Sequence, residues 1–278
     1  NLVTTRDAYP LPRIDQCLDA LGNGHCWFSV CDMRSGYYQV AMDEKDRDKT
    51  AFISHRGLHR YKTMPMGVMN APSTFQRLMD LIMAGLLYET CLVYLDDIII
   101  FSRTLDEHLS RLETVLQRLI ATVLKLKPSK CRLLQRRVEF LGHVISREGI
   151  ATDPAKTEAI ACWPTPRCVR DVRGFLGLCG YYRRFVDHYA EKAVPLTSLL
   201  KKNGKFRWTA ESQAAFECLK TALMSPPILA MPREPPVEPD GREGVYILDT
   251  DASDSSIGCV LSQVQDGQEK VIAYGARV

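Results

Sequence analysis

The 278-residue sequence lacks the features that would place it in several simple classes. It has no signal peptide and no uninterrupted apolar run long enough to cross a bilayer, so we expect neither export nor a membrane partner. It has ten cysteines but no CxxC pair, and its six histidines form no HExxH pattern. These absences argue against a zinc site or a disulfide framework. They favour reduced, buried cysteines in an intracellular protein.

A strong charge of one sign is also missing. The chain has 36 Lys and Arg against 33 Asp and Glu, a net charge of +3. Basic residues nevertheless dominate two stretches, KLKPSKCRLLQRR at 125–137 and VRDVRGFLGLCGYYRRF at 169–185. Such stretches suit a phosphate backbone, although a solvated helix face also produces them. The charge pattern therefore allows a nucleic-acid partner without requiring one.

Two adjacent acids stand between two apolar runs in the segment CLVYLDDIIIFS, residues 91–102. The runs 93–95 and 98–101 predict two β-strands, so Asp96 and Asp97 fall at the tight turn of a hairpin. Adjacent carboxylates repel each other and are costly to desolvate, and a divalent cation would offset both effects. The segment predicts either a metal site or a solvated Asp-Asp turn.

A third acid, Asp32, ends the predicted buried strand CWFSVCD at 26–32. Neighbouring strands can bring Asp32 to the same point as Asp96 and Asp97. Carboxylates from two strands at one sheet edge are the usual protein contribution to a two-metal site, which activates a hydroxyl nucleophile and stabilises a phosphate leaving group. The three aspartates therefore predict metal-assisted phosphoryl transfer.

The order of the predicted elements indicates an α+β fold for the first half of the chain. Pro72 opens a long helix, and a further helix is predicted from an apolar stripe formed by Leu109, Leu112, Leu116, Leu119 and Val123. With strands before, between and after these helices, the pattern is that of a split βαβ unit, an antiparallel sheet with helices on one face.

The second half is predicted to differ in character. After Gly149, short helices alternate with Pro and Gly, and prolines then cluster in a charged stretch, 226–243, that predicts a linker or loop. Three short strands follow, and the last reaches the end of the sequence at Val278. Because the chain also starts at Asn1 without a Met, we expect a fragment of a longer protein.

Eight motifs resemble, in order, the Pol polyprotein of gypsy-like LTR retrotransposons, which is similar to retroviral reverse transcriptase. They are DAYPLPRID, SVCDMRSGYYQVAM, MPMGVMNAPSTFQRLM, YLDD, LKLKPSKC, VEFLGHVIS, FLGLCGYYRRF and DTDASDSSIGCVLSQ. The resemblance implies a reverse transcriptase palm with partial fingers at 1–147 and a helical thumb or connection at 148–225. A linker at 226–243 and the start of a ribonuclease H-like α/β domain at 244–278 would follow.

The resemblance also implies roles for single residues. Asp32, Asp96 and Asp97 match the metal-binding triad, with Asp32 and Asp96 as ligands of both ions. The expected nucleotide-binding residues, with Tyr37 selecting the deoxyribose, are Tyr37, Met66, Gly67 and Lys130. The expected primer contacts are Tyr94, Leu95, Phe140, Leu141 and Gly142. Asp251 matches the first metal-binding aspartate of the ribonuclease H fold. From the residues alone, Tyr37 is also compatible with a core position and Lys130 with an ordinary surface position.

The expected activity is therefore RNA-directed DNA synthesis on a primed RNA or DNA template, with dNTPs and two Mg²⁺ ions, or Mn²⁺ in their place. The resemblance further implies the remainder of a Pol polyprotein as a partner, and a location in the cytoplasm, a virus-like particle or the nucleus. It does not specify an oligomeric state. Two alternatives stay open: a non-catalytic nucleic-acid-binding remnant, and an unrelated metal-dependent phosphatase or nuclease.

Overall fold

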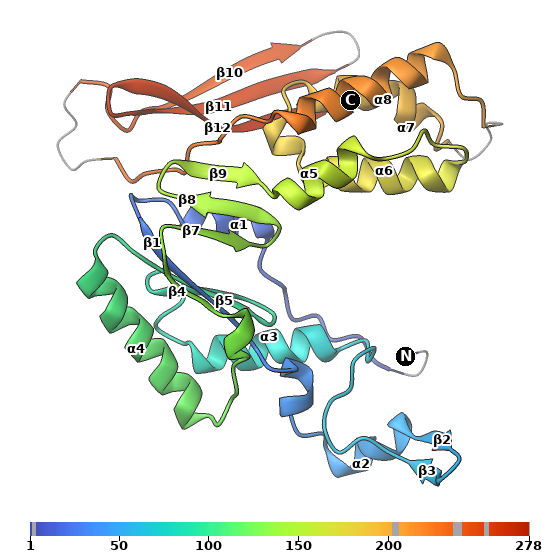
Figure 1. Cartoon of the computed structure of the whole chain (residues 1–278), viewed down its shortest axis with the longest axis vertical. Helices are drawn as coiled ribbons and strands as arrows, with labels where there is room; N and C mark the ends of the chain where they lie inside the picture. Colours follow the sequence, from blue (N-terminus) through green and yellow to red (C-terminus); the bar gives the residue numbers. More distant parts are fainter. Residues whose placement is uncertain (2–3, 202–205, 236–240, 253–255, 278) are drawn as a thin grey trace. The chain divides into compact units, whose positions relative to one another are not determined.

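A computed structural model describes residues 1, 4–201, 206–235, 241–252 and 256–277. The chain divides into two compact units, Asn1–Phe140 and Leu141–Val278 (Figure 1). Residues 236–240 of the predicted linker and 253–255 of the last motif lie outside the described residues. In the part of the chain that the structure describes, no helix has the length and apolar character needed to span a membrane.

The first unit is built on an antiparallel four-stranded sheet with the strand order β4-β5-β1-β6. The strands are β1 (Trp27–Asp32), β4 (Cys91–Tyr94), β5 (Asp97–Ser102) and β6 (Arg132–Gln135). Strand β1 pairs with β5 over its full length, from Trp27 opposite Ser102 to Asp32 opposite Asp97. Side chains alternate between the faces of a strand, so this register places both aspartates on one face.

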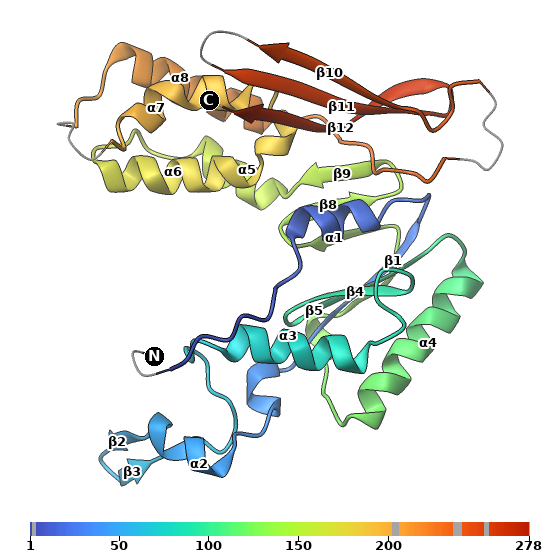
Figure 2. The same ribbon diagram turned by 180° about the vertical axis from the view of Figure 1, so that it is seen from behind.

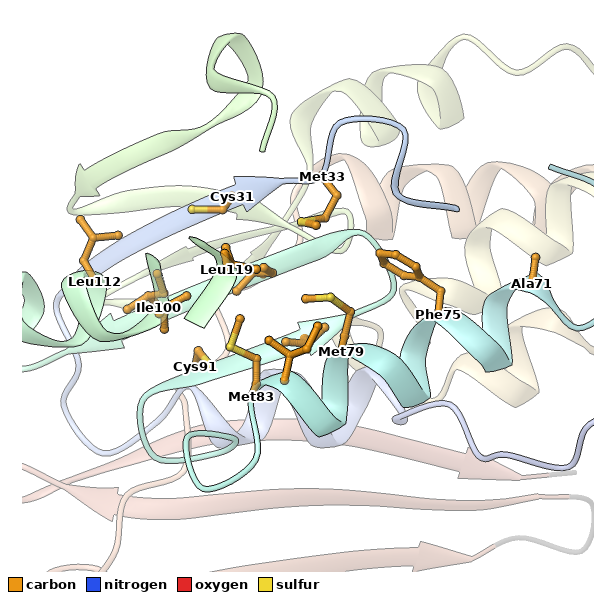
Figure 3. Close-up of a cluster of buried hydrophobic side chains, with 14 of the residues drawn as sticks. Cys31, Met33, Ala71, Phe75, Met79, Met83, Cys91, Ile100, Leu112 and Leu119 are labelled. Carbon is orange, nitrogen blue, oxygen red and sulfur yellow. The ribbon is translucent and has the colours of Figure 1, made fainter. Parts of the chain in front are cut away.

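Helices α3 (Ala71–Ile82) and α4 (Leu105–Ala121) cover the opposite face of this sheet. Pro72 stands in the first turn of α3, and the Thr104 hydroxyl caps α4 by accepting a hydrogen bond from the backbone N–H of Glu107. Figure 3 shows the apolar side chains between the helices and the sheet, among them Cys31, Phe75, Met79, Met83, Cys91, Ile100, Leu112 and Leu119. This core fixes the strands that carry the three aspartates.

The buried face of α4 differs from the stripe that the sequence predicts. Leu109 and Val123 are exposed, and Val123 lies beyond the end of the helix. The buried positions are His108, Leu112, Val115 and Leu119. His108 is accommodated because both of its ring nitrogens have partners, Ser29 Oγ at 2.7 Å from Nε2 and Ser102 Oγ at 2.9 Å from Nδ1.

The shorter elements of the first unit surround this sheet. They are α1 (Ile14–Ala20), η1 (Gly36–Gln39), α2 (Glu44–Arg47), η2 (Asp48–Thr50), β2 (Phe52–Ser54), β3 (Gly57–His59), η3 (Pro128–Lys130) and β7 (Arg137–Phe140). Strands β2 and β3 pair as an antiparallel hairpin. The 3-10 turns η1 and η3 follow β1 and precede β6, respectively, and they carry residues of the candidate site.

The second unit combines helices with an antiparallel sheet of order β10-β11-β12 (Figure 2). Its elements are β8 (His143–Ser146), β9 (Gly149–Thr152), α5 (Pro154–Ala161), α6 (Val169–Tyr181), η4 (Arg183–Phe185), α7 (Tyr189–Ser198), α8 (Ala210–Met224), β10 (Tyr246–Ala252), β11 (Ile257–Gln265) and β12 (Gln268–Arg277). The rings of Phe175 and Phe216 lie 4.6 Å apart between α6 and α8. Both the helical module and the three terminal strands agree with the sequence prediction.

Candidate active site

The three predicted aspartates lie at one end of strands β1, β4 and β5. Asp32 ends β1 directly opposite Asp97, which begins β5. Asp96 stands in the turn between β4 and β5, where Leu95 adopts a left-handed conformation with φ of 53°. The backbone N–H of Met33 donates to the carbonyl oxygen of Asp96 at 3.2 Å, which ties the turn to the end of β1. The predicted hairpin is therefore confirmed, but Leu95 lies in the turn instead of on a strand, and Asp97 begins β5 instead of lying in the turn.

The three carboxylates repel one another. Burial is the first cause of a raised pKa at Asp97, and the charge of Asp32 is the second. Burial likewise raises the pKa of Asp96, followed by the charges of Asp97 and Asp32. Lys130 acts in the opposite direction on both groups. The site thus has more negative charge than its own residues compensate.

Lys130 supplies a positive charge at the site. Its Nζ lies 3.1 Å from Oδ2 of Asp32. The 3-10 turn that carries it is anchored to the same strand, because the backbone N–H of Lys127 donates to the carbonyl oxygen of Asp32 at 2.8 Å. The structure therefore brings the predicted Lys130 to the aspartates.

Gly36 leaves the space that the Asp96 carboxylate occupies. A Cβ atom built on Gly36 would lie 2.2 Å from Asp96 Oδ1 and 2.8 Å from Cζ of Phe75. Tyr37 follows in the same 3-10 turn and packs edge to face against Phe75, with ring centroids 5.5 Å apart. Burial first, and then the charge of Asp96, raise the pKa of the Tyr37 hydroxyl. Tyr37 is partly buried beside the carboxylates.

The side chain of Gln76 binds the turn that carries Asp96. This role of Gln76 was not predicted from the sequence. Its Oε1 accepts the backbone N–H of Leu95 at 2.7 Å, and its Nε2 donates to the carbonyl oxygen of Val93 at 3.1 Å and to Asp80 Oδ1 at 2.9 Å. The side chain is fully buried. In the sequence, the sign of this role is a polar residue next to the apolar positions of the helix that precedes the hairpin.

The donor set of the site fits a divalent cation. Asp96 Oδ1 is buried and has no hydrogen-bond partner, and three carboxylates that repel one another offer the oxygen ligands that Mg²⁺ prefers. In the described chain, however, no three His, Cys, Asp or Glu side chains already converge as a metal-binding group. The side chains would therefore have to adjust to hold an ion.

The other predicted nucleotide and primer residues of the first unit are more dispersed. Tyr94 ends β4 opposite Asp97 and is partly buried. Met66 and Gly67 lie in the loop between β3 and α3, where Met66 is exposed and Gly67 has a φ of 88°. The contacts described for these two loop residues do not join them to the aspartates.

Phe140, Leu141 and Gly142 form the turn between two strands. Phe140 ends β7 in the first unit and is buried, whereas the other two belong to the second unit. Leu141 and Gly142 have φ values of 46° and 64°, the left-handed pair typical of a type I′ turn. Their carbonyl oxygens accept hydrogen bonds of 2.6 Å from the hydroxyls of Tyr181 and Tyr182, respectively. A rigid turn results.

Asp251 lies on strand β10, opposite Gly258 of β11, and is exposed. This is the first hairpin of the predicted ribonuclease H-like domain. Within the described residues no metal-binding group of three side chains includes it.

Comparison with protein families agrees with this geometry. Residues 2–145 match the family "Reverse transcriptase (RNA-dependent DNA polymerase)", and residues 208–278 match "RNase H-like domain found in reverse transcriptase". The second match contains α8 and strands β10 to β12. The second match begins within the segment that the motifs assign to the thumb or connection, earlier than the ribonuclease H-like start expected at 244.

Similar curated proteins are retrotransposon polyproteins. The Pol polyprotein from transposon 297 of Drosophila melanogaster is 43% identical over 95% of this chain, and that from transposon gypsy is 37% identical over 95%. The Tf2-3 polyprotein of Schizosaccharomyces pombe is 34% identical over 93%. The chain spans only 24%, 26% and 19% of these three relatives, respectively.

Solved structures with the same fold include the foamy viral protease-reverse transcriptase in complex with double-stranded DNA, with a TM-score of 0.84 and 23% identity over 99% of this chain and 47% of that one. The same viral protein in complex with an RNA/DNA hybrid has a TM-score of 0.80 and 24% identity over 98% of this chain and 36% of that one. At these identities the likeness establishes the fold. The motifs, the sheet that carries the aspartates and the family match together show that this chain belongs to the reverse transcriptase (RNA-dependent DNA polymerase) family, with gypsy-like retrotransposon Pol polyproteins among its relatives.

Proposed function

We propose that this chain is the polymerase part of a retrotransposon Pol protein and catalyses RNA-directed DNA synthesis from dNTPs on a primed template. The observation that carries the proposal is the register of β1 and β5, which sets Asp32 opposite Asp97 with Asp96 in the adjoining turn. Two strands and a turn that are fixed by a packed core can hold carboxylates at a reacting phosphate.

Asp32, Asp96 and Asp97 would hold two Mg²⁺ ions, with Asp32 and Asp96 as ligands of both. The ions would supply Lewis-acid activation of the primer 3′-hydroxyl and neutralise charge on the triphosphate. In this proposal the ammonium group of Lys130 leaves Asp32 and neutralises or protonates the departing pyrophosphate. Its Nζ lies 3.1 Å from Oδ2 of Asp32, the partner that it would leave in order to bind the substrate.

The proposal gives Tyr37 the role of a sugar selector. The ring is held by its edge-to-face contact with Phe75 and lies near Asp96. A fixed ring beneath the incoming sugar would exclude a 2′-hydroxyl. We therefore expect Tyr37→Ala to raise the rate of ribonucleotide incorporation relative to that of dNTPs, which single-nucleotide extension with matched rNTP and dNTP pairs would measure.

Nucleic-acid contacts complete the proposal. Met66 and Gly67 would contact the nucleotide and the template, while Tyr94, Leu95, Phe140, Leu141 and Gly142 would contact the primer. The two tyrosine hydroxyls that fix the Leu141–Gly142 turn support a positioning role for it. Ribonuclease H activity, with Asp251 as one metal ligand, is proposed for the longer polyprotein.

Primer extension on poly(rA)/oligo(dT) tests the assignment. We expect Mg²⁺-dependent incorporation of dTTP that Asp96→Asn abolishes, because the amide keeps the shape of the side chain but loses a charged metal ligand. Asp106→Asn is the matched control, since Asp106 is exposed in the first turn of α4, which follows the end of β5 opposite to Asp97. Incorporation that survives Asp96→Asn would refute the assignment.

The alternative, a non-catalytic nucleic-acid-binding remnant, makes a different prediction. It would bind primer-template in a salt-sensitive manner without any Mg²⁺-dependent incorporation. Calorimetric titration of Mn²⁺ separates the two: we expect binding that Asp96→Asn removes and Asp106→Asn does not. A chain that binds duplex but neither Mn²⁺ nor dTTP would favour the remnant.

A further inference from the structure

Two cysteines lie beside the candidate site on adjacent segments. Cys31 immediately precedes Asp32 on β1, and Cys131 immediately follows Lys130, before β6. Val30 is paired with Arg132 in the antiparallel register, and the Asp32 and Lys130 side chains are joined at 3.1 Å. Cys31 and Cys131 are the intervening positions, so they stand opposite each other.

The two thiols face the same side of the sheet. Cys31 is fully buried and belongs to the core cluster that Figure 3 draws, and Cys131 packs against the same core. Their side chains are close enough to interact directly. Directly opposite residues of an antiparallel pair have Cα atoms roughly 4.5–5.5 Å apart, which lies inside the span of about 4.4–6.8 Å that a disulfide bridges.

Access differs between the two cysteines. Cys131 is only partly buried, and its thiol donates to the carbonyl oxygen of Lys127 at 3.4 Å. The surrounding stretch, 125–132, contains four basic residues, Lys125, Lys127, Lys130 and Arg132, of which Lys130 is paired with Asp32. Exposure therefore makes Cys131 the thiol that a dissolved disulfide such as glutathione disulfide can reach, while Cys31 is shielded from solvent.

We propose that Cys31 and Cys131 form a redox-responsive pair whose oxidation to a disulfide cross-links the metal-binding strand to the Lys130 turn. None of the catalytic roles proposed above uses either thiol. The cross-link would join two segments that are far apart in sequence and would do so on the core side of β1, directly behind Asp32.

The chemistry is thiol-disulfide exchange with a low-molecular-weight disulfide as the oxidant. The Cys131 sulfur attacks one sulfur of glutathione disulfide, forms a mixed disulfide and releases one glutathione, which takes the proton from Cys131. The Cys31 sulfur then attacks the Cys131 sulfur and releases the second glutathione, which takes the proton from Cys31. Two thiols are oxidised and one disulfide is reduced to two thiols, so atoms and electrons balance.

The expected consequence for the site rests on the proposed polymerase function. In the proposed function, Lys130 leaves Asp32 when an ion and a triphosphate bind. A covalent bond between their neighbours restrains that separation. We therefore expect the oxidised chain to need a higher Mg²⁺ concentration for primer extension, and expect reduction by dithiothreitol to restore the original requirement.

Peptide mapping tests the cross-link independently of activity. The native chain is incubated with glutathione disulfide, free thiols are blocked, and the protein is digested with chymotrypsin under non-reducing conditions. Cleavage after Phe28 separates Cys31 from Cys26. We expect a disulfide-linked pair of peptides containing Cys31 and Cys131 that dithiothreitol releases, and expect it to be absent from Cys131→Ser. Cys218→Ser, at an exposed cysteine, should retain it.

Several outcomes would overturn the proposal. One is Cys131 carrying only glutathione; another is a linked pair that involves other cysteines. Cys31→Ala gives a second test that does not depend on Cys131→Ser folding normally, and it should stop the reaction at the mixed disulfide. If the cross-link forms but the Mg²⁺ requirement is unchanged, the regulatory effect is refuted. A reduced chain without any primer extension would refute the polymerase proposal, while the peptide map still decides on the cross-link.

Discussion

The arrangement of the individual site residues lowers the stability of the folded protein. The carboxylates of Asp96 and Asp97 are partly desolvated and repel each other, and one oxygen of Asp96 is buried without a partner. Gly36 contributes by the absence of a side chain, which leaves room for Asp96. Such a site gives up stability to keep its charged groups poised for a ligand.

The first prediction concerns Gly36→Ala. The added methyl group would overlap Asp96 Oδ1 and Phe75, so the carboxylate must move. We expect about 10- to 100-fold weaker Mn²⁺ binding or primer extension, the usual effect of disturbing the groups that orient metal ligands. Gly177→Ala in α6 is the control, because a Cβ there meets nothing within 4 Å. Equal effects of the two changes would contradict the prediction.

The second prediction concerns Asp97→Asn in the metal-free chain. The folded pKa of Asp97 is raised above its value in the unfolded chain, so its contribution to stability falls as pH rises through the folded pKa and stays unfavourable at neutral pH. The amide removes this penalty. We expect the melting temperature in EDTA at neutral pH to rise by about 2–4 °C while primer extension is lost. A lower melting temperature would refute the argument.

At the scale of the elements, the sequence predicted the helices and strands whose apolar period is clear and missed those that depend on distant partners. The YLDD hairpin follows from two apolar runs around a polar turn. Strand β6 was missed because all of its side chains are exposed and it is held by backbone pairing with β1. His108 was not recognised as a core residue, because the serines that satisfy it, Ser29 and Ser102, come from strands β1 and β5.

The bonds of His108 indicate its tautomer. Ser102 Oγ donates to the carbonyl oxygen of Thr104, so it accepts from Nδ1–H. In the neutral ring Nε2 is then the acceptor, and Ser29 Oγ, which also accepts the backbone N–H of Leu134, is its donor. Burial, followed by Arg111, lowers the pKa of His108 in the folded state.

The third prediction is a loss of stability in acid caused by His108. Its contribution is complete above the unfolded pKa near 6.5 and is lost as pH falls toward the lower folded value. Denaturant unfolding of the original chain and of His108→Gln between pH 7.5 and 5.5 measures this contribution. We expect the unfolding free energy of the original chain to fall by up to about 1.4 kcal/mol per pH unit below 6.5. Some slope will remain in the variant, because burial also lowers the pKa of His25, to about 4. Identical slopes would contradict the assignment.

The fourth prediction concerns the turn beneath the site. Gln76→Leu leaves the backbone N–H of Leu95 without its partner, which costs about 1–3 kcal/mol of unfolding free energy. Gln117→Leu on the exposed face of α4 is the control. Chemical denaturation measures both. We also expect primer extension to fall in Gln76→Leu alone, because the turn that carries Asp96 is loosened.

At the scale of the whole molecule, the chain is two compact units whose combined net charge is small, so any affinity for nucleic acid must come from local concentrations of basic residues. The composition could not reveal this, because it averages the basic stretch at 125–137 with acidic segments elsewhere. The family resemblance, carried by motifs spread along the chain, predicted the domain order that composition alone left open.

The fifth prediction concerns salt. We expect the affinity for primer-template to fall linearly on a plot of log K against log salt concentration. Replacing Lys125 and Lys127 together by Ala should reduce the slope by about 0.9 for each phosphate contact that is lost. Replacing the exposed Lys45 and Lys49 of the first unit should change it less. Fluorescence anisotropy with a labelled duplex measures both slopes. Equal slopes for the two double variants would contradict a nucleic-acid contact at Lys125 and Lys127.

The pairing of β1 with β5 has a consequence for how such chains can diverge. Because side chains alternate along a strand, inserting or deleting one residue in β1 would turn Asp32 into the core and expose a neighbouring apolar side chain. Substitutions in these strands can be absorbed one at a time, whereas a single-codon insertion cannot. Among copies of a retrotransposon that encodes such a chain, differences in chain length should therefore occur in loops. The spacing between Trp27 and Asp32 should stay constant.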